Sequence, residues 1–194
     1  MPSPVGHALG GIAAGVPLTG RSRTAVWVLA AIGVAADLDL LAGAHRGISH
    51  SLGAAVVTGL VTFALTRSVR WAAAGAAAWG SHVLLDWLGA DAWPPLGIPA
   101  LWPFANTYYR APVTIFPAVS RQYWLGARFV YFNALALAVE LAILLPLAWI
   151  VLRVTRPVST SRSASESDQH DLAWDRGTCT LSQTWRKSDS CLSY

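Results

Sequence analysis

Charged residues are scarce in this chain: they make up 12% of its 194 residues, whereas 54% of the residues are hydrophobic. Soluble domains carry about 25% charged residues, so the composition argues against an ordinary soluble domain. The charges are also unevenly spread, because residues 1–155 hold nine arginines and five acids while residues 156–194 hold five basic and five acidic residues. We therefore expect a membrane-embedded domain over residues 1–155 and a polar, Ser/Thr-rich, disordered cytoplasmic tail over residues 156–194.

Lysine and cysteine are nearly absent. The chain has a single Lys, and its arginines are scattered between apolar runs, so no nucleic-acid partner is expected. Cys179 and Cys191 both lie in the expected tail, which excludes a disulfide framework or a CxxC metal site in the membrane domain. HExxH and GxSxG motifs are missing, so an intramembrane protease is the least favoured enzyme class. No positive charge precedes the first apolar run, so we expect no cleavable signal peptide.

Long apolar runs are plentiful, and a bilayer-spanning helix needs about 20 such residues. Five candidate segments are Val5–Leu18, Thr24–Leu41, His50–Thr66, Trp71–Gly89 and Ala127–Leu152. The first reaches only about 21 Å as a helix, so it either spans with help from its flanks or forms a re-entrant helix. Gly11 and Gly15 give it a face of small residues for close helix packing. We expect an all-α fold, a polytopic membrane bundle of four to five transmembrane helices.

The arginines indicate the orientation of this bundle. If all five segments cross, six arginines fall on the side of Arg21 and the C-terminal tail, and four fall on the other side. Cytoplasmic loops carry the excess of positive charge, so the Arg21 side faces the cytoplasm. A loop over residues 90–126, rich in Pro and aromatic residues, suits the opposite membrane interface. We therefore expect a multi-pass protein of the inner or plasma membrane.

Ionisable side chains within the apolar part are the most informative residues, because each costs about 2.5–3.5 kcal/mol to insert and marks a functional site by default. In this orientation, seven of them converge on the extracytoplasmic rim: His7, Asp37, Asp39, His45, His50, His82 and Asp86. Glu140 differs because it lies in the middle of the last segment. We interpret Glu140 and Asn133 as an interhelical hydrogen-bonded pair. The seven converging groups predict a metal site.

The spacing of these residues supports metal binding. His82 and Asp86 are four residues apart and share a helix face, as the two metal ligands of a zincin helix do. Asp37 and Asp39 point at one site only if their helix ends or unwinds, which the glycines that follow favour. Ligands of His and Asp without Cys suit one or two divalent ions, Zn²⁺ first and Mn²⁺ as the alternative. Each pair alone has a plainer interpretation: a buried ion pair for the first, a helix cap for the second.

A hydrolytic site follows from these groups. The primary metal site is expected to comprise two imidazoles and two carboxylates: His50, His82, Asp86 and either Asp37 or Asp39. His7 and His45 complete it or hold a second ion. Arg46 is placed to bind a substrate anion, so we count it with Asp39 and His50 as catalytic. A metal-activated water would cleave a phosphoester, of a membrane lipid or another small molecule, at headgroup level.

A non-enzymatic membrane protein is the alternative from another class, either a metal or ion transporter or a scaffold with a structural metal site. A transporter places polar groups along a path through the bilayer. In this chain they gather at one rim, and only Glu140 and Asn133 lie deep. This distribution favours the hydrolase.

Several motifs follow one another in a recognisable order. They are His7, then ADLD at 36–39, HRGISHS at 45–51, SHVLLD at 81–86 and GIPALWPF at 97–104. This order resembles the YdjM-like family of inner-membrane, metal-dependent hydrolases, whose members are often described as regulated by the LexA repressor. The resemblance implies a multi-span hydrolase with these His and Asp residues as metal ligands. The family also looks like distant kin of zinc-dependent phospholipase C and P1-type nuclease, which implies phosphoester chemistry by analogy of fold.

Overall fold

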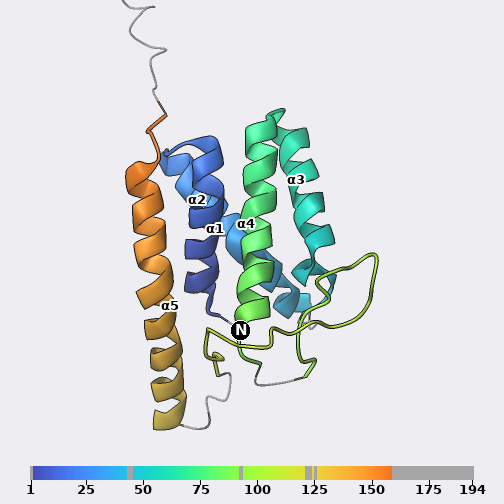
Figure 1. The fold of residues 1–194 in the computed structure, drawn as a ribbon, viewed down its shortest axis with the longest axis vertical. Helices are drawn as coiled ribbons and strands as arrows, with labels where there is room; N and C mark the ends of the chain where they lie inside the picture. The colour runs from blue at the N-terminus through green and yellow to red at the C-terminus, as the bar shows by residue number, and fades with distance from the viewer. Residues whose placement is uncertain (1, 43–45, 92–93, 121–123, 125, 159–194) are drawn as a thin grey trace, which may run out of the picture. The chain divides into compact units, whose positions relative to one another are not determined.

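The computed structural model describes residues 2–42, 46–91, 94–120, 124 and 126–158, and these residues form an all-α fold, as predicted (Figure 1). The chain divides into two units, Met1–Pro157 and Val158–Tyr194, and the described helices all lie in the first. They are α1 (Pro4–Thr19), α2 (Arg23–Ala35), α3 (Leu52–Thr66), α4 (Val69–Leu88), α5 (Ala127–Val154) and the 3₁₀ helices η1 (Ala36–Ala42) and η2 (Ile48–His50). Most of the predicted tail, residues 159–194, lies outside the described residues, so its disorder stays a prediction.

Serine side chains mark where four of the helices begin. Hydroxyl groups accept hydrogen bonds from backbone N–H groups three residues later at Ser3, Ser22, Ser51 and Ser68. Such caps satisfy N–H groups that have no partner within the first helical turn. Each α-helix therefore begins within two residues of the start of its predicted apolar run.

The helix α1 is central to the bundle, because it packs against α2, α4 and α5, while α3 packs against α4. Consecutive helices run in opposite directions (Figure 1). The first turns of α1 and α3 therefore lie at the same end of the bundle as η1, η2 and the last turn of α4. We call this the loop end, since the long connection from α4 to α5 also lies there.

Small residues let α1 and α2 approach each other closely. A Cβ atom on Gly11 would collide with the backbone carbonyl of Leu29, and one on Gly33 would lie 2.5 Å from the carbonyl oxygen of His7. Gly15 also faces the Leu29 side chain, so the small-residue face of the first run is used for packing. Towards the other end, the helices bury an apolar core of Val16, Ala25, Leu29, Ala74 and Ala78.

One described helix, α5, is long and apolar enough to cross a membrane. A second, α3, is apolar but shorter, with 15 residues. The other helices combine short length or polar side chains with apolar faces, and α4 carries Arg70, His82 and Asp86 within its 20 residues. The prediction of a helical bundle is therefore confirmed, whereas the number of four to five spans stays a prediction.

Candidate metal centre

Five ionisable side chains meet at the loop end of the bundle. They are His7 of α1, Asp37 of η1, His50 of η2, and His82 and Asp86 of α4, which we call the His/Asp cluster. All five are buried, and none is more than 9% exposed. The α-helix α2 ends at Ala35 and continues as the 3₁₀ helix η1 from Ala36. Regular α-helix therefore stops just before Asp37 and Asp39, as their spacing led us to expect.

The imidazole nitrogens and carboxylate oxygens of the cluster face one another. His50 Nε2 lies 3.2 Å from Asp86 Oδ2 and 3.6 Å from Asp37 Oδ1. His82 Nε2 lies 3.4 Å from Asp86 Oδ2 and 3.7 Å from Asp37 Oδ1, and His7 Nε2 lies 3.4 Å from Asp86 Oδ1. The His82 ring stacks on His7 at 3.8 Å and meets His50 edge-on at 4.9 Å between centroids. Three imidazoles thus present the same nitrogen, Nε2, to two carboxylates.

Three of these five separations, at 3.2–3.4 Å, are those expected between two ligands of one cation, and the two distances to Asp37 are longer. Good N–H···O hydrogen bonds mostly span about 2.7–3.2 Å. Two ligands that each lie about 2.1 Å from Zn²⁺, at right to tetrahedral angles, are about 3.0–3.4 Å apart. Two groups of three residues bring their possible ligand atoms close together: His7–Asp37–His82 and His50–His82–Asp86. Within each group, these atoms all lie within 4.8 Å of one another. The donor set of imidazole nitrogen and carboxylate oxygen is the one that Zn²⁺ and Mn²⁺ accept.

Buried polar atoms that lack a hydrogen bond provide a second test of the fit. Among the described residues, no hydrogen bond reaches Nε2 of His7, Nε2 of His82 or either carboxylate oxygen of Asp86. An unsatisfied buried polar group costs free energy, and a buried charge costs more. A bound divalent cation would provide partners for such atoms, so the residues present fit a divalent metal.

Backbone geometry orients His82 for such a role. Its Nδ1 lies 2.8 Å from the carbonyl oxygen of Gly33 and donates to it, which leaves the lone pair on Nε2 for the cluster. Gly33 lies in the last turn of α2, where carbonyl groups lack partners within the helix. The close crossing of Gly33 with Gly11 therefore helps to fix both α2 and the ring orientation of His82.

Asp39 lies behind the His50 ring and not among its Nε2 contacts. Asp39 Oδ2 is 3.2 Å from His50 Nδ1 and accepts a hydrogen bond of 2.8 Å from Ser49 Oγ, which is itself 2.9 Å from the same Nδ1. Asp37 and Asp39 thus approach the two nitrogens of one imidazole from different sides. Such a carboxylate–histidine pair fixes the ring and strengthens its other nitrogen as a ligand. Asp37 therefore faces the cluster, whereas Asp39 contacts the His50 ring at its other nitrogen.

Arg46 contacts the loop between α4 and α5 and not the cluster atoms described above. Its guanidinium pairs with the Asp91 carboxylate, and its Nη1 donates to the carbonyl oxygens of Pro95 and Gly97, each at 3.3 Å. Both side chains of the pair are buried, at 4% and 2% exposed. Burial disfavours the charged form of Asp91, but hydrogen bonds from Arg46 and the Gly97 N–H outweigh it, so the pKa of Asp91 lies below its ordinary value. The expected anion-binding guanidinium thus has an internal carboxylate as its partner.

The remaining predicted residues lie elsewhere. His45 is outside the described residues, so its place in the site stays a prediction. The pairing of Glu140 with Asn133 is wrong: Glu140 accepts hydrogen bonds from Ser3 N, at 2.8 Å, and from Ser3 Oγ, whereas Asn133 bonds both backbone groups of Ser120. Seven positions on one helix place the two side chains on a similar face, but they do not decide which neighbouring segment each one meets.

Sequence reasoning missed three contributors to this end of the molecule. Ser49 adjoins a predicted ligand, and Asp91 is an acid in an apolar loop, so both carried a weak signal. Gly33 acts through its backbone carbonyl, and no side-chain pattern reports such a role. The sequence thus identified the side chains of the His/Asp cluster better than the groups that contact them from outside it.

Comparisons with known proteins support the inner-membrane character of the chain. A family model described as YdjM inner membrane protein matches residues 1–158. Neither the curated proteins nor the solved structures contain a match. The matched residues include every member of the His/Asp cluster.

Proposed function

The chain belongs to the YdjM inner membrane protein family, and from this premise we propose that it is a membrane-bound, metal-dependent hydrolase that cleaves a phosphoester in a lipid-like substrate. The observation that carries the proposal is the meeting of three histidine Nε2 atoms with two carboxylates in one buried cluster, from four separate elements. One divalent cation, Zn²⁺ first and Mn²⁺ as the alternative, is the proposed cofactor.

The proposed ligands are His7, Asp37, His50, His82 and Asp86. A divalent cation supplies Lewis acidity and lowers the pKa of a coordinated water towards about 7. The protein's own groups do the rest: Asp39 and Ser49 hold the His50 ring, and the Gly33 carbonyl holds His82. Arg46 has a structural place in this proposal, because its donors already meet Asp91 and two carbonyl groups.

Substrate would approach the cluster from the side of η1. Within the cluster, Asp37 is the most exposed member at 9%, and the neighbouring Leu38 is well exposed. The other four members are at most 2% exposed. A phosphoester of a lipid fits this direction, since we place the loop end at the extracytoplasmic headgroup layer.

The proposed membrane arrangement extends the finding that α5 is long and apolar enough to span. We place α1–α4 in the bilayer beside α5, with Arg21, Arg67 and Arg153 at the cytoplasmic end. The antiparallel order of the helices supports this arrangement, because it gathers these arginines at the end away from the cluster (Figure 1). The short helices α1 and α2 reach only about 24 Å and 20 Å and would need interfacial flanks.

A structural metal site in a non-enzymatic protein is the second candidate, and burial favours it. Structural metal sites are closed, whereas catalytic sites keep an open coordination position. The near-complete burial of His7, His50, His82 and Asp86 agrees with a closed site. The two candidates share the metal and differ in turnover, which makes them separable by experiment.

Metal content tests both candidates first. The detergent-purified protein should contain about one divalent ion per chain, the content expected for a single metal site. His82→Ala and Asp86→Ala should lose it, while His170→Ala, which changes a histidine of the polar tail, should retain it. Unchanged metal content in the first two variants would overturn the metal site altogether.

Activity then separates the hydrolase from the structural site. We expect the metal-loaded protein to hydrolyse a short-chain phospholipid or bis-p-nitrophenyl phosphate, and His82→Ala to be inactive. A metal-loaded protein without phosphoesterase activity on either substrate would overturn the hydrolase and leave a structural site. Flux of the same metal into liposomes would instead identify a transporter.

A further inference from the structure

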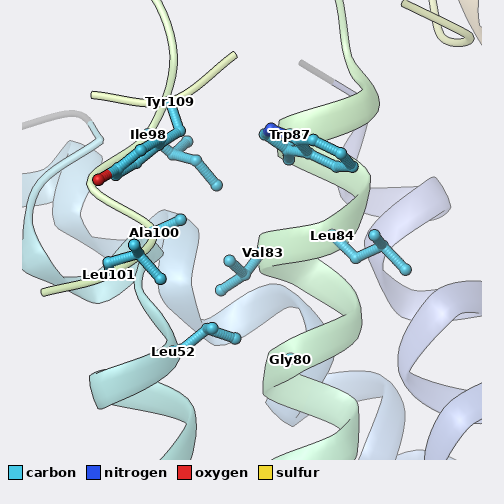
Figure 2. Close-up of a pocket in the computed structure, with 9 residues that line it drawn as sticks. All are labelled: Leu52, Gly80, Val83, Leu84, Trp87, Ile98, Ala100, Leu101 and Tyr109. Atoms are coloured by element: carbon cyan, nitrogen blue, oxygen red, sulfur yellow. The ribbon is translucent and has the colours of Figure 1, made fainter. Parts of the chain in front are cut away.

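A hollow of about 300 Å³ lies beside α4 at the loop end (Figure 2). One wall is α4 itself, with Gly80, Val83, Leu84 and Trp87. The other wall is Leu52 at the start of α3 together with parts of residues 98–109 of the long loop. Figure 2 shows Val83 pointing from α4 into the space between these two walls. The volume is at the lower limit of small-molecule sites, which start at about 300 Å³.

The lining of this pocket restricts what it can hold. None of the nine lining residues is charged, and only Trp87 and Tyr109 carry a polar side-chain group. A polar ligand would lose hydrogen bonds to water without gaining new ones. The chemistry of the walls therefore fits a hydrocarbon chain.

The rim of the pocket continues an exposed apolar surface. Leu52 and Leu84 are 50% and 52% exposed, and Val56 and Leu60 on the next turns of α3 are exposed as well. Contiguous exposed apolar surface marks a site of interaction with membrane or protein. In the proposed membrane arrangement, this surface faces lipid, so acyl chains are the molecules that lie against the mouth of the pocket.

The pocket and the His/Asp cluster use the same turns of α4. Val83 follows His82, Trp87 follows Asp86, and Leu52 comes two residues after His50. Successive residues of an α-helix point about 100° apart, so these neighbours line different faces of one helix. The thickness of a helix with its side chains is about 10–12 Å, and this sets the scale of the separation.

We propose that the pocket binds one acyl chain of a membrane phospholipid. Resting on the proposed function, this lipid is the substrate whose phosphoester the metal centre cleaves. The pocket then acts as a specificity site, because it holds the chain while the headgroup lies at the level of the cluster. Acyl-chain binding would also give a role to the apolar side chains of residues 98–109, which the metal site does not use.

Gly80 offers a direct way to fill the pocket. A Cβ atom at this position would meet no atom within 4 Å, so larger side chains enter open space. Gly80→Leu should occupy part of the hollow, whereas Gly80→Ala makes the same backbone change and leaves most of the volume. Ala100→Phe fills the pocket from the other wall and serves as a second variant if Gly80→Leu does not fold.

The test is photo-cross-linking in vesicles of phosphatidylglycerol that carries a diazirine in one acyl chain. In metal-free wild-type protein, adducts should concentrate in peptides that contain residues 80–87 and 98–109. Gly80→Leu should clearly lower these adducts, because the leucine side chain fills space that the acyl chain would otherwise occupy. Gly80→Ala should retain them, and adducts on the exposed face of α5 should stay unchanged in every variant.

Three outcomes would overturn the acyl site. Adducts in the pocket that are no denser than those on α5, or that do not respond to Gly80→Leu and Ala100→Phe, would mean ordinary contact with bulk lipid. Dimers cross-linked through the pocket without lipid adducts would mean that a second protein chain covers it.

Hydrolysis by the same variants keeps the two proposals distinguishable. Pocket adducts without hydrolysis by metal-loaded protein would overturn the proposed function and leave the acyl site. Hydrolysis that is equally fast in wild-type protein and Gly80→Leu would overturn the substrate role of the pocket and leave the hydrolase.

Discussion

The two ends of the same helices bury opposite kinds of side chain. At the loop end, α1 and α4 bury His7, His82 and Asp86. Towards the other end, the same two helices bury Val16, Ala74 and Ala78 against Leu29. The apolar half gains stability from dispersion and removal of surface from water. The polar half buries groups that cost free energy unless something satisfies them.

This contrast shows where a small helical bundle can position polar, reactive side chains. Helix ends and 3₁₀ turns supply the polar groups, since Asp37, Ser49 and the Gly33 carbonyl all lie where regular helix stops or starts. The close apolar packing of α1, α2 and α4 holds these helix ends in fixed positions relative to one another. The polar half should therefore respond to metal, charge and pH, and the apolar half should not.

Breaking the buried ion pair should have the largest effect on stability. Asp91→Ala leaves the Arg46 guanidinium buried without its carboxylate, which typically costs about 3–5 kcal/mol. SDS-induced unfolding in mixed micelles measures the loss. The double variant Arg46→Met/Asp91→Leu should recover much of it, because apolar residues replace both charges. An Asp91→Ala protein as stable as wild type would contradict a stabilising role for the buried Arg46–Asp91 ion pair.

Metal binding should stabilise the polar half nearly as strongly. A ligand at 1,000 times its dissociation constant raises the free energy of unfolding by about 4 kcal/mol. We expect this increment when Zn²⁺ is added to chelator-treated wild type, and little of it in Asp86→Asn. Leu29→Ala provides the matched apolar variant: it should lower stability by about 2.7–5 kcal/mol yet retain the metal increment. Loss of the increment in Leu29→Ala would show that the halves are not separable.

A methyl group added where α1 crosses α2 should affect both halves of the bundle. Gly11→Ala places a Cβ against the Leu29 carbonyl and 3.1 Å from Gly33 Cα, so α2 must shift. Overpacking of this kind costs about 1–3 kcal/mol. Since the Gly33 carbonyl orients His82, we also expect Zn²⁺ affinity to fall about tenfold, as on loss of an outer-shell partner. Gly80→Ala, with open space around its Cβ, should change neither quantity by a comparable amount.

Acidification should produce the smallest effect and one confined to the polar half. The pKa of Asp91 lies below its ordinary value of 3.8, so its charged form stabilises the fold at higher pH. This contribution is complete above about pH 4 and is lost as the pH falls through the folded-state pKa. The stability difference between wild type and Asp91→Asn should therefore shrink below about pH 4. A stability difference between the two proteins that does not change with pH would show that titration of Asp91 does not affect stability.

Local patterns predicted the helices well and their partners poorly. The apolar runs and serine caps locate each helix, and the aspartate spacing anticipates the change from α2 to η1. Partners of Arg46 and Glu140 could not be read in this way, because Asp91 and Ser3 are 45 and 137 residues away in sequence. Periodicity reports which face a residue occupies, and only packing decides what lies opposite.

The same limit explains the outcome for the predicted site. His7, Asp37, His50, His82 and Asp86 share one end of the bundle because helix direction alternates, which the run lengths already implied. The distinction between Asp37 and Asp39 depends on which His50 nitrogen each one approaches, and that is set by the 3₁₀ geometry of η1.

The contact between Glu140 and Ser3 bears on the order in which the protein is made. The carboxylate that receives the Ser3 N–H and hydroxyl comes 137 residues later along the chain, on α5, the last helix among the described residues. Until α5 has been synthesised and inserted, the segment that carries His7 lacks this anchor. Translation arrested before residue 140 would thus yield a nascent chain whose His7-bearing segment lacks this hydrogen-bonded anchor, so we expect the His/Asp cluster to be complete only after α5 has been made.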